Sequence, residues 1–408
     1  MATLDTPFIR SLFPAFAQPS LAGKAFFENA GGSYTSKFVI DRLTRFYTQR
    51  KVQPYAPYEA ATLAGAEMDE AQTRMAAILG VERDELCFGP STSQNTYVLA
   101  QAFRQFLKPG DAIVVTNQDH EANTGVWRRL AESGTEVREW RVDPQTGHLD
   151  PQDLAKLLDD KVKLVCFPHC SNIVGEVNPV AEICAMAHAV GAYTCVDGVS
   201  YAPHGFADVG ALGADIYMFS SYKTFGPHQG IMVVRRELAM ALPNQGHYFN
   251  AEYVHKRFTP AGEDHAQIAA CAGMADYVDA VYAHHFSGAA DAGARARAVH
   301  DLQASHERKL LAPLLDYLRV RNDIRLLGPD DATRRVPTVA LVADRPGEEI
   351  ARALAAHGIM AWGGDFYAVR LLEAMGVDPA HGALRLSFVH YTAADEVQKL
   401  ISALDAVL

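Results

Sequence analysis

Residues 162–197, VKLVCFPHCSNIVGEVNPVAEICAMAHAVGAYTCVD, decide the fold class. An apolar run, VKLVCFP at 162–168, precedes VAEICAMAHAVG at 180–191, in which apolar residues recur with helical spacing. A second short apolar run, AYTCVD at 192–197, follows directly. Two buried strands joined by a helix are typical of neighbouring parallel strands in a sheet that helices cover on both faces.

The same alternation extends from about residue 70 to residue 240. We expect helices at 68–80, 93–107, 122–134 and 151–159, and strands at 111–117 and 136–142. Two further apolar strands, ADIYMF and IMVVRR, flank the polar segment SSYKTFGPHQG at 220–230. The pattern predicts an α/β protein with a largely parallel sheet between helices.

The pattern changes after about residue 265. A long helix is expected at 294–320, then a strand at 338–344, a helix at 347–358, a strand at 383–389 and a closing helix. We therefore place a large domain at 21–265 and a smaller α/β domain at 266–408. Residues 1–20 are expected to form an N-terminal segment that packs on the small domain.

Composition excludes several classes of partner. The 408 residues include 37 Lys and Arg and 48 Asp and Glu, which gives a net charge of −11 and disfavours nucleic-acid binding. The N-terminal MATLDTPFIRSLFPAF lacks the basic stretch and apolar core of a secretory signal, and no apolar run is long enough to span a bilayer. We expect a soluble, cytoplasmic protein with no membrane partner.

The six cysteines do not form a recognisable disulfide or metal pattern. Cys166 and Cys170 flank His169, but this spacing is poor for zinc and no second ligand pair follows. Buried free thiols are the ordinary alternative. We predict no metal site.

Lys223 lies between two strands that should both be buried. A lysine charge is unfavourable there unless it is matched or removed. Pyridoxal phosphate removes it by forming a Schiff base with the amine. Such a site also needs a carboxylate for the pyridine nitrogen, donors for the phosphate and a flat group against the ring.

Polar residues that follow the strands supply these groups, since ligands of open α/β sheets gather beyond the carboxyl ends of the strands. The segments concerned are Asp119–His120, His169–Asn172, Asp197 and Lys223, and we expect them to share one crevice. Asp197 is the candidate for the pyridine nitrogen, although a turn or helix-cap role is the ordinary alternative for an aspartate. His120 could lie flat on the ring, although a lone histidine is more often structural.

GPSTSQN at 89–95 leads directly into an expected helix, and helix N-termini bind phosphate through free N–H groups. Thr92 and Ser93 would add hydroxyl donors, and Ser220 and Tyr222 could approach from the other side. Simple helix capping is the alternative for the first pair. The sequence contains neither a GxGxxG fingerprint nor a P-loop, so a nucleotide cofactor has no support.

Several motifs together resemble the class V aminotransferase family of fold type I pyridoxal phosphate enzymes, and within it the cysteine desulfurase-like branch. They are FENAGGS, STSQNTYVLA, DHEAN, HCSNIVGEVNPV, VDGVSYAPHGFADV and SSYKTFGPHQG. The resemblance covers nearly the whole chain. It implies a large domain with a mainly parallel, seven-stranded type of sheet, a smaller α/β domain, and a homodimer with its site near the subunit interface.

The resemblance also assigns roles. Lys223 would form the Schiff base, Asp197 would pair with the pyridinium and His120 would stack on the ring. Further cofactor contacts would come from Thr92, Ser93, Asn172, Ser200, Ser220 and Tyr222. Arg385 would bind the substrate α-carboxylate, for which a guanidinium fork is suited. Asn29, Trp362 and Tyr367 would complete the substrate side of the pocket. A surface ion pair is the ordinary alternative for Arg385.

The chain departs from the desulfurase pattern on the substrate side. Desulfurases need a cysteine nucleophile on a loop of the small domain, but the corresponding region, GIMAWGGDFYAVRLLEAMG, has none, and no cysteine follows Cys271. Ser200 stands where glutamine is usual, Tyr222 where histidine is common, and Trp362 where a second arginine often lies. Sulfur transfer through a persulfide is therefore disfavoured.

These observations predict a pyridoxal phosphate enzyme that acts on an amino acid, either as an aminotransferase or as a C–S lyase that performs β-elimination. Epimerisation and a cysteine desulfurase or selenocysteine lyase-like activity remain alternatives, because all begin by removing a group from the same carbon. A non-catalytic protein of this fold would be expected to have lost Lys223 or Asp197. A nucleotide-dependent dehydrogenase would need the missing glycine fingerprint.

Overall fold

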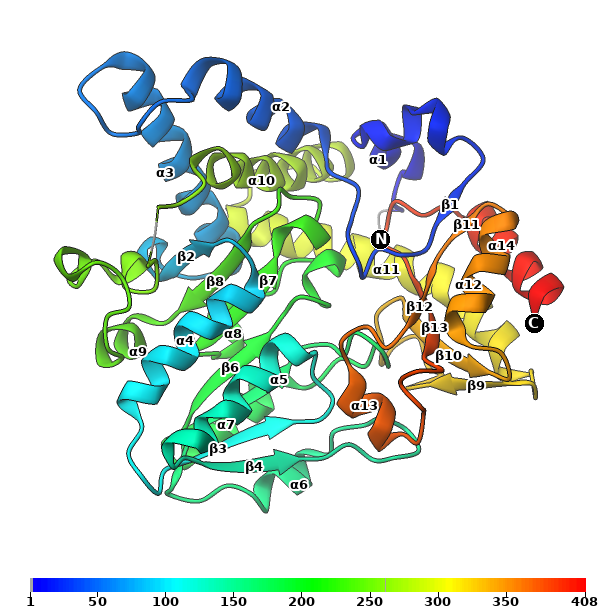
Figure 1. Cartoon of the computed structure of the whole chain (residues 1–408). Coiled ribbons are helices and arrows are strands. Elements are labelled where there is room, and N and C mark those ends of the chain that lie inside the picture. The colour runs from blue at the N-terminus through cyan, green and yellow to red at the C-terminus, as the bar shows by residue number, and fades with distance from the viewer. Residues whose placement is uncertain (1–2, 261) are drawn as a thin grey trace.

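The computed structural model describes residues 3–260 and 262–408. Its larger sheet has seven strands in the order β2-β8-β7-β6-β5-β3-β4 (Figure 1). The strands are β2 Leu86–Gly89, β3 Ala112–Thr116, β4 Glu136–Trp140, β5 Val162–Pro168, β6 Tyr193–Asp197, β7 Ile216–Ser220 and β8 Gly230–Val234. β3 to β7 are parallel, whereas β8 runs antiparallel to β7 and β2 antiparallel to β8. The prediction of a largely parallel sheet is confirmed.

Helices cover both faces of this sheet, which explains why its strands read as continuous apolar runs. Alternate strand residues face two different cores: Val114 and Val165 belong to one, Ile113 and Leu164 to the other. The second core includes Leu99, Phe103 and Trp127 from α4 (Thr92–Phe106) and α5 (Glu121–Arg128). The remaining helices of this part are α2 Lys37–Arg45, α3 Glu59–Leu79, α6 Pro151–Ala155, α7 Val180–Ala189, α8 Val209–Leu212, α9 Arg236–Ala241 and α10 His265–His285.

A second, antiparallel sheet has the order β12-β13-β10-β9. Its strands are β9 Ile324–Leu327, β10 Thr338–Ala343, β12 Trp362–Gly364 and β13 Ala383–Ser387. It packs with α11 Ala292–Arg319, α12 Gly347–Ala356 and α14 Ala394–Val407 around a separate apolar core. Figure 1 shows α11, in yellow, extending from the larger sheet's helices to this second layer.

Segments distant in sequence complete the second layer. β1 (Ala25–Phe26) pairs in parallel with β11 (Ile359–Met360), so the chain just before FENAGGS lies beside the C-terminal sheet. α13 (Val369–Ala374) follows β12. α1 (Thr6–Ser11) contacts both layers, because Arg10 pairs with Glu396 at 2.8 Å and the Asp5 amide donates to His285 at 2.9 Å.

Most expected elements agree with the structure to within a few residues, but α10 was not predicted. This helix buries residues on every side between α2, α3 and α11, so it lacks the polar stripe that marks a surface helix. The helix expected at 122–134 also proves to be α5 followed by a 3-10 turn, Arg129–Ser133. In the described part of the chain, none of the helices has the length and apolarity needed to cross a membrane.

Candidate active site

A cavity of about 800 Å³ opens at the carboxyl ends of β5, β6 and β7. The N-termini of α4 and α5 form one side, and β12, the loop after it and β13 form the opposite side. Twelve of the thirteen residues expected at the site line it: Thr92, Ser93, His120, Asn172, Asp197, Ser200, Ser220, Tyr222, Lys223, Trp362, Tyr367 and Arg385. The topology therefore brings the expected cofactor and substrate groups into one space.

Two expected positions lie outside this cavity wall. Asn29 is buried behind it, where its Oδ1 accepts a hydrogen bond from the Tyr391 hydroxyl at 2.5 Å and its Nδ2 lies 3.5 Å from the Lys223 carbonyl. His169, which was expected to join the crevice, instead stacks on Tyr201 with ring centroids 3.6 Å apart. Its strand ends one residue earlier, so its side chain points into the protein.

Lys223 ends the short 3-10 turn that follows β7. Among the described residues its amine makes no ion pair or hydrogen bond, and the ring of Tyr222 is centred 5.9 Å away. Burial, and next the positive charge of Arg385, lower the pKa of Lys223 to about 8. The neutral fraction of this amine near physiological pH is therefore far larger than that of an ordinary lysine, and a nucleophilic lysine reacts in its neutral form.

Asp197 is the last residue of β6, and its Oδ1 accepts the Val199 amide at 2.8 Å. Burial raises the pKa of this carboxyl to about 6. Asp119 lies beside it, and burial followed by the charge of Asp197 raises the pKa of Asp119 well above its ordinary range. The Asp119 Oδ1 atom is buried with no partner among the described residues. A cationic group bound at this end of the cavity would offset the repulsion between the carboxylates of Asp197 and Asp119.

The start of α4 supplies donors. The Thr92 hydroxyl, at the first helical residue, lies 2.9 Å from the Ser220 hydroxyl at the end of β7. A Cβ on Gly230 would come within 2.8 Å of the Thr92 nitrogen, so glycine allows β8 to approach the helix start closely. Two hydroxyls and the free N–H groups of a 15-residue helix thus face one point, an arrangement suited to phosphate.

His120 precedes α5, and its Nδ1 accepts the Ala122 amide at 3.0 Å. Burial, then the charges of Lys223 and Arg385, lower the pKa of His120 to about 3. Its imidazole is therefore neutral and fixed at the cavity wall. The ring lies 5.5 Å from that of Tyr367, at an interplanar angle of 46°.

Arg385 projects from β13 into the opposite end of the cavity. Its guanidinium lies 3.9 Å from the centre of the Phe366 ring and pairs with Glu28 at 2.8 Å. Asn172 lies beside it and donates from Nδ2 to the Phe366 carbonyl at 3.0 Å. Glu28 was missed by sequence reasoning. Its position in FENAGGS, one residue before Asn29, was the only available signal.

The loop after β12 holds two consecutive residues with left-handed backbone, Phe366 (φ 53°) and Tyr367 (φ 55°). Such conformations are unfavourable for residues other than glycine and concentrate at functional sites. The Glu121 amide donates to the Tyr367 carbonyl at 2.8 Å, which ties the loop to the start of α5. Trp362 and Tyr367 are respectively 55% and 69% exposed, so both present aromatic surface at the mouth.

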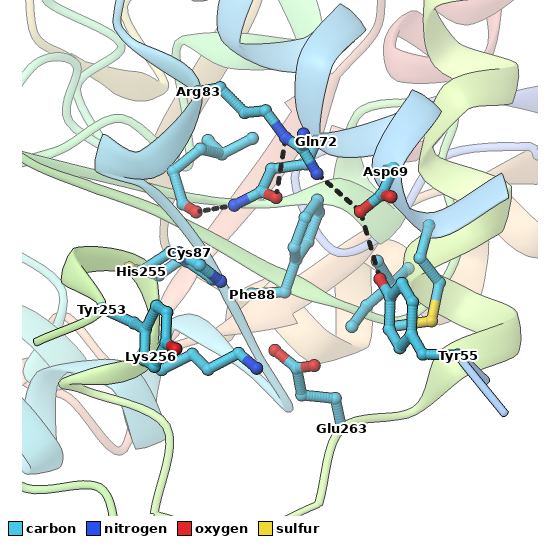
Figure 2. Close-up of a pocket in the computed structure, with 13 residues that line it drawn as sticks. Tyr55, Asp69, Gln72, Arg83, Cys87, Phe88, Tyr253, His255, Lys256 and Glu263 are labelled. Carbon is cyan, nitrogen blue, oxygen red and sulfur yellow. Dashed lines mark hydrogen bonds and ion pairs between the residues drawn. The ribbon is translucent and has the colours of Figure 1, made fainter. Parts of the chain in front are cut away.

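A separate cavity of about 270 Å³ shares no lining residue with the first. Figure 2 shows Lys256, His255 and Glu263 facing it from one side and Tyr55, Asp69 and Arg83 from the other. Tyr55 donates to Asp69 at 3.1 Å, and Arg83 pairs with the same carboxylate at 2.5 Å. This cavity holds none of the expected site residues.

Comparison with known proteins identifies the family. The aminotransferase class-V model matches residues 25–400. The chain belongs to the class V aminotransferase family. Its pyridoxal phosphate-dependent members include aminotransferases and cysteine desulfurases.

Two curated members of the class V family are similar to the chain over most of their length. The aminotransferase-like protein FGM3 of Gibberella zeae is 33% identical over 98% of this chain and 98% of its own. A cysteine desulfurase of Haloferax volcanii is 29% identical over 93% of this chain and 88% of its own.

Solved structures share the fold. The cysteine desulfurase CsdA of Escherichia coli superposes with a TM-score of 0.82 at 22% identity, covering 99% of this chain and 98% of its own. An apo cysteine desulfurase of Thermococcus onnurineus NA1 gives a TM-score of 0.86 at 22% identity, covering 100% and 99%. The predicted fold class is thereby confirmed.

The residues present fit pyridoxal phosphate. The amine of Lys223 has no partner in the described chain, while Asp119 leaves a buried oxygen unsatisfied at the acidic end. The Thr92 and Ser220 hydroxyls meet at a helix N-terminus. An aldehyde, a ring nitrogen that can carry a proton and a phosphate would each meet a complementary group.

Proposed function

We propose that this chain is a pyridoxal phosphate-dependent enzyme that acts on an amino acid, either as an aminotransferase or as a C–S lyase that performs β-elimination. One observation carries the proposal: in a class V family member, Lys223 faces the same cavity as Asp197 and Arg385. An amine, a carboxylate and a guanidinium so placed match the three charged groups that cofactor and substrate would bring.

Each residue then has a stated task. Lys223 would hold the cofactor, Asp197 would face its ring nitrogen, His120 would cover the ring, and Thr92, Ser93, Ser220 and Tyr222 would bind the phosphate. Asn172 and Ser200 would add contacts to the cofactor. When bound, the cofactor supplies an electron sink for bonds at the substrate α-carbon.

The protein groups supply the proton transfer and the orientation. Arg385 would hold the substrate carboxylate and so fix which bond at the α-carbon faces Lys223. The amine of Lys223, with its pKa of about 8, is suited to accept the α-proton near neutral pH and to return it at a neighbouring atom. Burial keeps His120 neutral, and its hydrogen bond with the Ala122 amide holds the imidazole in place. The imidazole would exclude water from the face of the cofactor ring that it covers.

A persulfide route like that of desulfurases has less support. All six cysteines of the chain are buried, and the segment from β11 to α13 that borders the cavity contains none. A thiol must be reachable and ionisable to accept sulfur. Burial instead raises the pKa of the Cys170 thiol, the cysteine that borders the cavity, above its ordinary value.

We also propose a homodimer. Six aromatic side chains lie exposed in two segments that meet at the second cavity: Tyr47, Tyr55, Tyr58, Tyr248, Phe249 and Tyr253. Exposed apolar surface of this kind is typical of an interface. Sedimentation equilibrium should report twice the chain mass, and the double change Tyr248→Ser and Phe249→Ser should weaken the association. A monomer at micromolar concentration would contradict the proposal.

Product analysis tests the activity. The purified protein, loaded with pyridoxal phosphate, is incubated with a panel of amino acids that includes cysteine and cysteine sulfinate. A keto acid matching the substrate, with the cofactor converted to its amine form, indicates transamination. Pyruvate with the original cofactor spectrum indicates β-elimination. Transfer of the substrate sulfur to a cysteine of the protein, as a persulfide, would overturn the proposal in favour of a desulfurase.

A further inference from the structure

Arg385 forms an ion pair with a carboxylate of the protein itself. Its Nη2 lies 2.8 Å from the Glu28 Oε1, and the two side chains are 4% and 17% exposed. The other contacts of this guanidinium are weak: its Nη1 lies 3.4 Å from the Asn172 carbonyl, and its Nε is buried with no partner among the described residues. Glu28 is therefore the main neutralising group for Arg385.

The backbone around Glu28 places its carboxylate beside Arg385. Glu28 follows β1, and its backbone bridges to Ser387 at the end of β13, two residues from Arg385. A Cβ on Gly31 would collide with the Glu28 Oε1 atom, so only glycine leaves room for the carboxylate. The pairing joins residues 357 positions apart, which makes it a feature of the fold and not of local sequence.

The pair is incompletely satisfied on both sides. Glu28 Oε2 and Arg385 Nε are both buried without partners in the described part of the chain. Burial raises the pKa of the Glu28 carboxyl despite the nearby Arg385, which shows how little solvation this carboxylate receives. A substrate carboxylate that offered Arg385 two oxygens would make the better bidentate partner.

We propose that Glu28 is a built-in competitor for the substrate carboxylate, which occupies Arg385 in the free protein and is displaced when substrate binds. This inference rests on the proposed function, because it assumes that Arg385 receives the substrate. It makes Glu28 a specificity-determining residue. A ligand with a full negative charge can replace the carboxylate of Glu28 on Arg385, whereas a neutral amide cannot.

Removing the competitor should strengthen carboxylate binding. Glu28→Gln leaves Arg385 as a buried cation without its counter-charge, and an unpaired buried charge is strongly unfavourable. An incoming carboxylate then relieves that charge without first breaking an ion pair. A residue that merely positioned Arg385 would give the opposite result, since its loss would misplace the guanidinium and weaken binding.

The test measures binding and not turnover. Protein loaded with pyridoxal phosphate is titrated with 2-methylalanine, which has no α-proton to lose, and with its carboxamide, while the cofactor absorbance is followed. We expect Glu28→Gln to increase the preference for the acid over the amide by about tenfold or more. Glu28→Asp keeps the charge on a side chain that is one methylene shorter, so it should increase the preference for the acid by a smaller factor.

Glu348→Gln is the matched control. Glu348 also borders the cavity but pairs with Arg352 at 2.8 Å, so its change removes the same charge without freeing Arg385. We expect its preference for the acid over the amide to equal that of the wild type. An unchanged or reduced preference in Glu28→Gln, or an equal increase in Glu348→Gln, would overturn the inference.

A second readout separates this inference from the proposed function and also serves if Glu28→Gln folds poorly. Trp362 lies opposite Arg385 in the β12–β13 register, and it lines the cavity. Its fluorescence can therefore report isobutyrate or isobutyramide binding to cofactor-free protein, in both Glu28→Gln and Glu28→Asp. If the protein fails to bind pyridoxal phosphate, the proposed function is wrong, but the role of Glu28 can still be tested with isobutyrate. Failure of both variants to favour isobutyrate more than the wild type does would overturn the role of Glu28.

Discussion

Lys223 and Asp197 show how burial shifts the pKa values of two oppositely charged groups at the proposed cofactor site. Burial lowers the pKa of the lysine and raises that of the aspartate, so the two values approach each other, at about 8 and about 6. Both shifts have the same physical cause, the poor solvation of the charged form. In both side chains the charged form is poorly solvated, so a bound group that neutralises the charge is more favourable here than it would be in water.

The pKa of Lys223 sets a pH dependence for cofactor capture. Only the neutral amine attacks an aldehyde, so the capture rate should rise with pH and level off above about 8. Stopped-flow absorbance of cofactor-free protein mixed with pyridoxal phosphate from pH 6 to 10 measures this profile. A capture rate that still rises steeply at pH 10, as the ordinary lysine value of 10.5 requires, would show that the pKa of this amine is not lowered.

Asp197 should matter for turnover more than for cofactor retention. Asp197→Asn keeps the shape but removes the charge that would hold a proton on the ring nitrogen. We expect kcat to fall by about 10²–10³-fold, similar to the loss of one preorganised electrostatic contact, while the bound-cofactor absorbance is retained. Wild-type turnover in Asp197→Asn would contradict the assignment.

These two residues could be predicted from sequence because each follows an apolar strand, and strand ends share one edge of a parallel sheet. Glu28 could not be predicted, because its pairing with Arg385 depends on how β1 meets the C-terminal sheet. His169 shows the converse limit. It also follows a strand, but side chains alternate in direction there, and one residue decides whether the ring faces the cavity or the core.

At the scale of elements, the start of α4 depends on its close approach to β8. Gly230 pairs with Gly89 on β2 and lies against the Ser91–Thr92 backbone. A strand with any side chain at this position would push the helix N-terminus away from Ser220. Gly230 is therefore required for the geometry of the proposed phosphate site.

Gly230→Ala tests this dependence. The new Cβ would stand 2.5 Å from the Ser91 carbonyl carbon and 2.8 Å from the Thr92 nitrogen, so the backbone must shift. We expect affinity for pyridoxal phosphate, measured by absorbance titration, to fall by about tenfold or more. Gly293→Ala in α11 is the control, since the nearest atom to its Cβ would be the flexible end of Arg297, 3.2 Å away, and its next neighbours would lie at an ordinary contact distance of 3.5 Å. Equal affinities in the two variants would contradict the account.

Elements with a clear apolar period were predictable, whereas fully enclosed ones were not. β5 was placed at its observed bounds, because VKLVCFP is bordered by polar residues. α10 was missed because its alanines and larger apolar residues are buried on every side. The short strands β1, β11 and β12 have two or three residues each, too few for any period to be seen.

At the scale of the whole molecule, a buried polar network links the larger sheet's loops to the C-terminal sheet. Glu307 on α11 lies 2.8 Å from Nδ1 of His204, which is seven residues after Asp197, and 3.7 Å from His390, which is five residues after Arg385. His390 in turn lies 2.5 Å from the Tyr277 hydroxyl. This network joins the segments that follow Asp197 and Arg385, the residues proposed to meet the cofactor and the substrate.

Glu307→Gln should destabilise the protein by about 1.5–3 kcal/mol, because it removes the charged acceptor of a buried hydrogen bond with His204. Burial opposes the charge of Glu307, but the attraction and hydrogen bonds of His204 and His390 together outweigh it and hold the pKa of Glu307 below the ordinary 4.5. A lowered pKa contributes stability that is complete above 4.5 and is lost as the pH falls through the folded value.

Urea unfolding from pH 7 down to pH 3 measures both effects. The difference in unfolding free energy between wild type and Glu307→Gln should be fully present above pH 4.5 and should narrow as the pH falls below that value. Glu348→Gln, at an exposed position, should unfold like the wild type throughout. A gap of less than about 1 kcal/mol at pH 7 would show that the network contributes little.

The site of cofactor attachment shows directly whether Lys223 forms the Schiff base. The protein is incubated with pyridoxal phosphate, reduced with borohydride, digested and sequenced by mass spectrometry. We predict one phosphopyridoxyl group per chain, on Lys223, and no specific label in Lys223→Ala. Stable labelling of another lysine, or no labelling at saturating cofactor, would contradict the account.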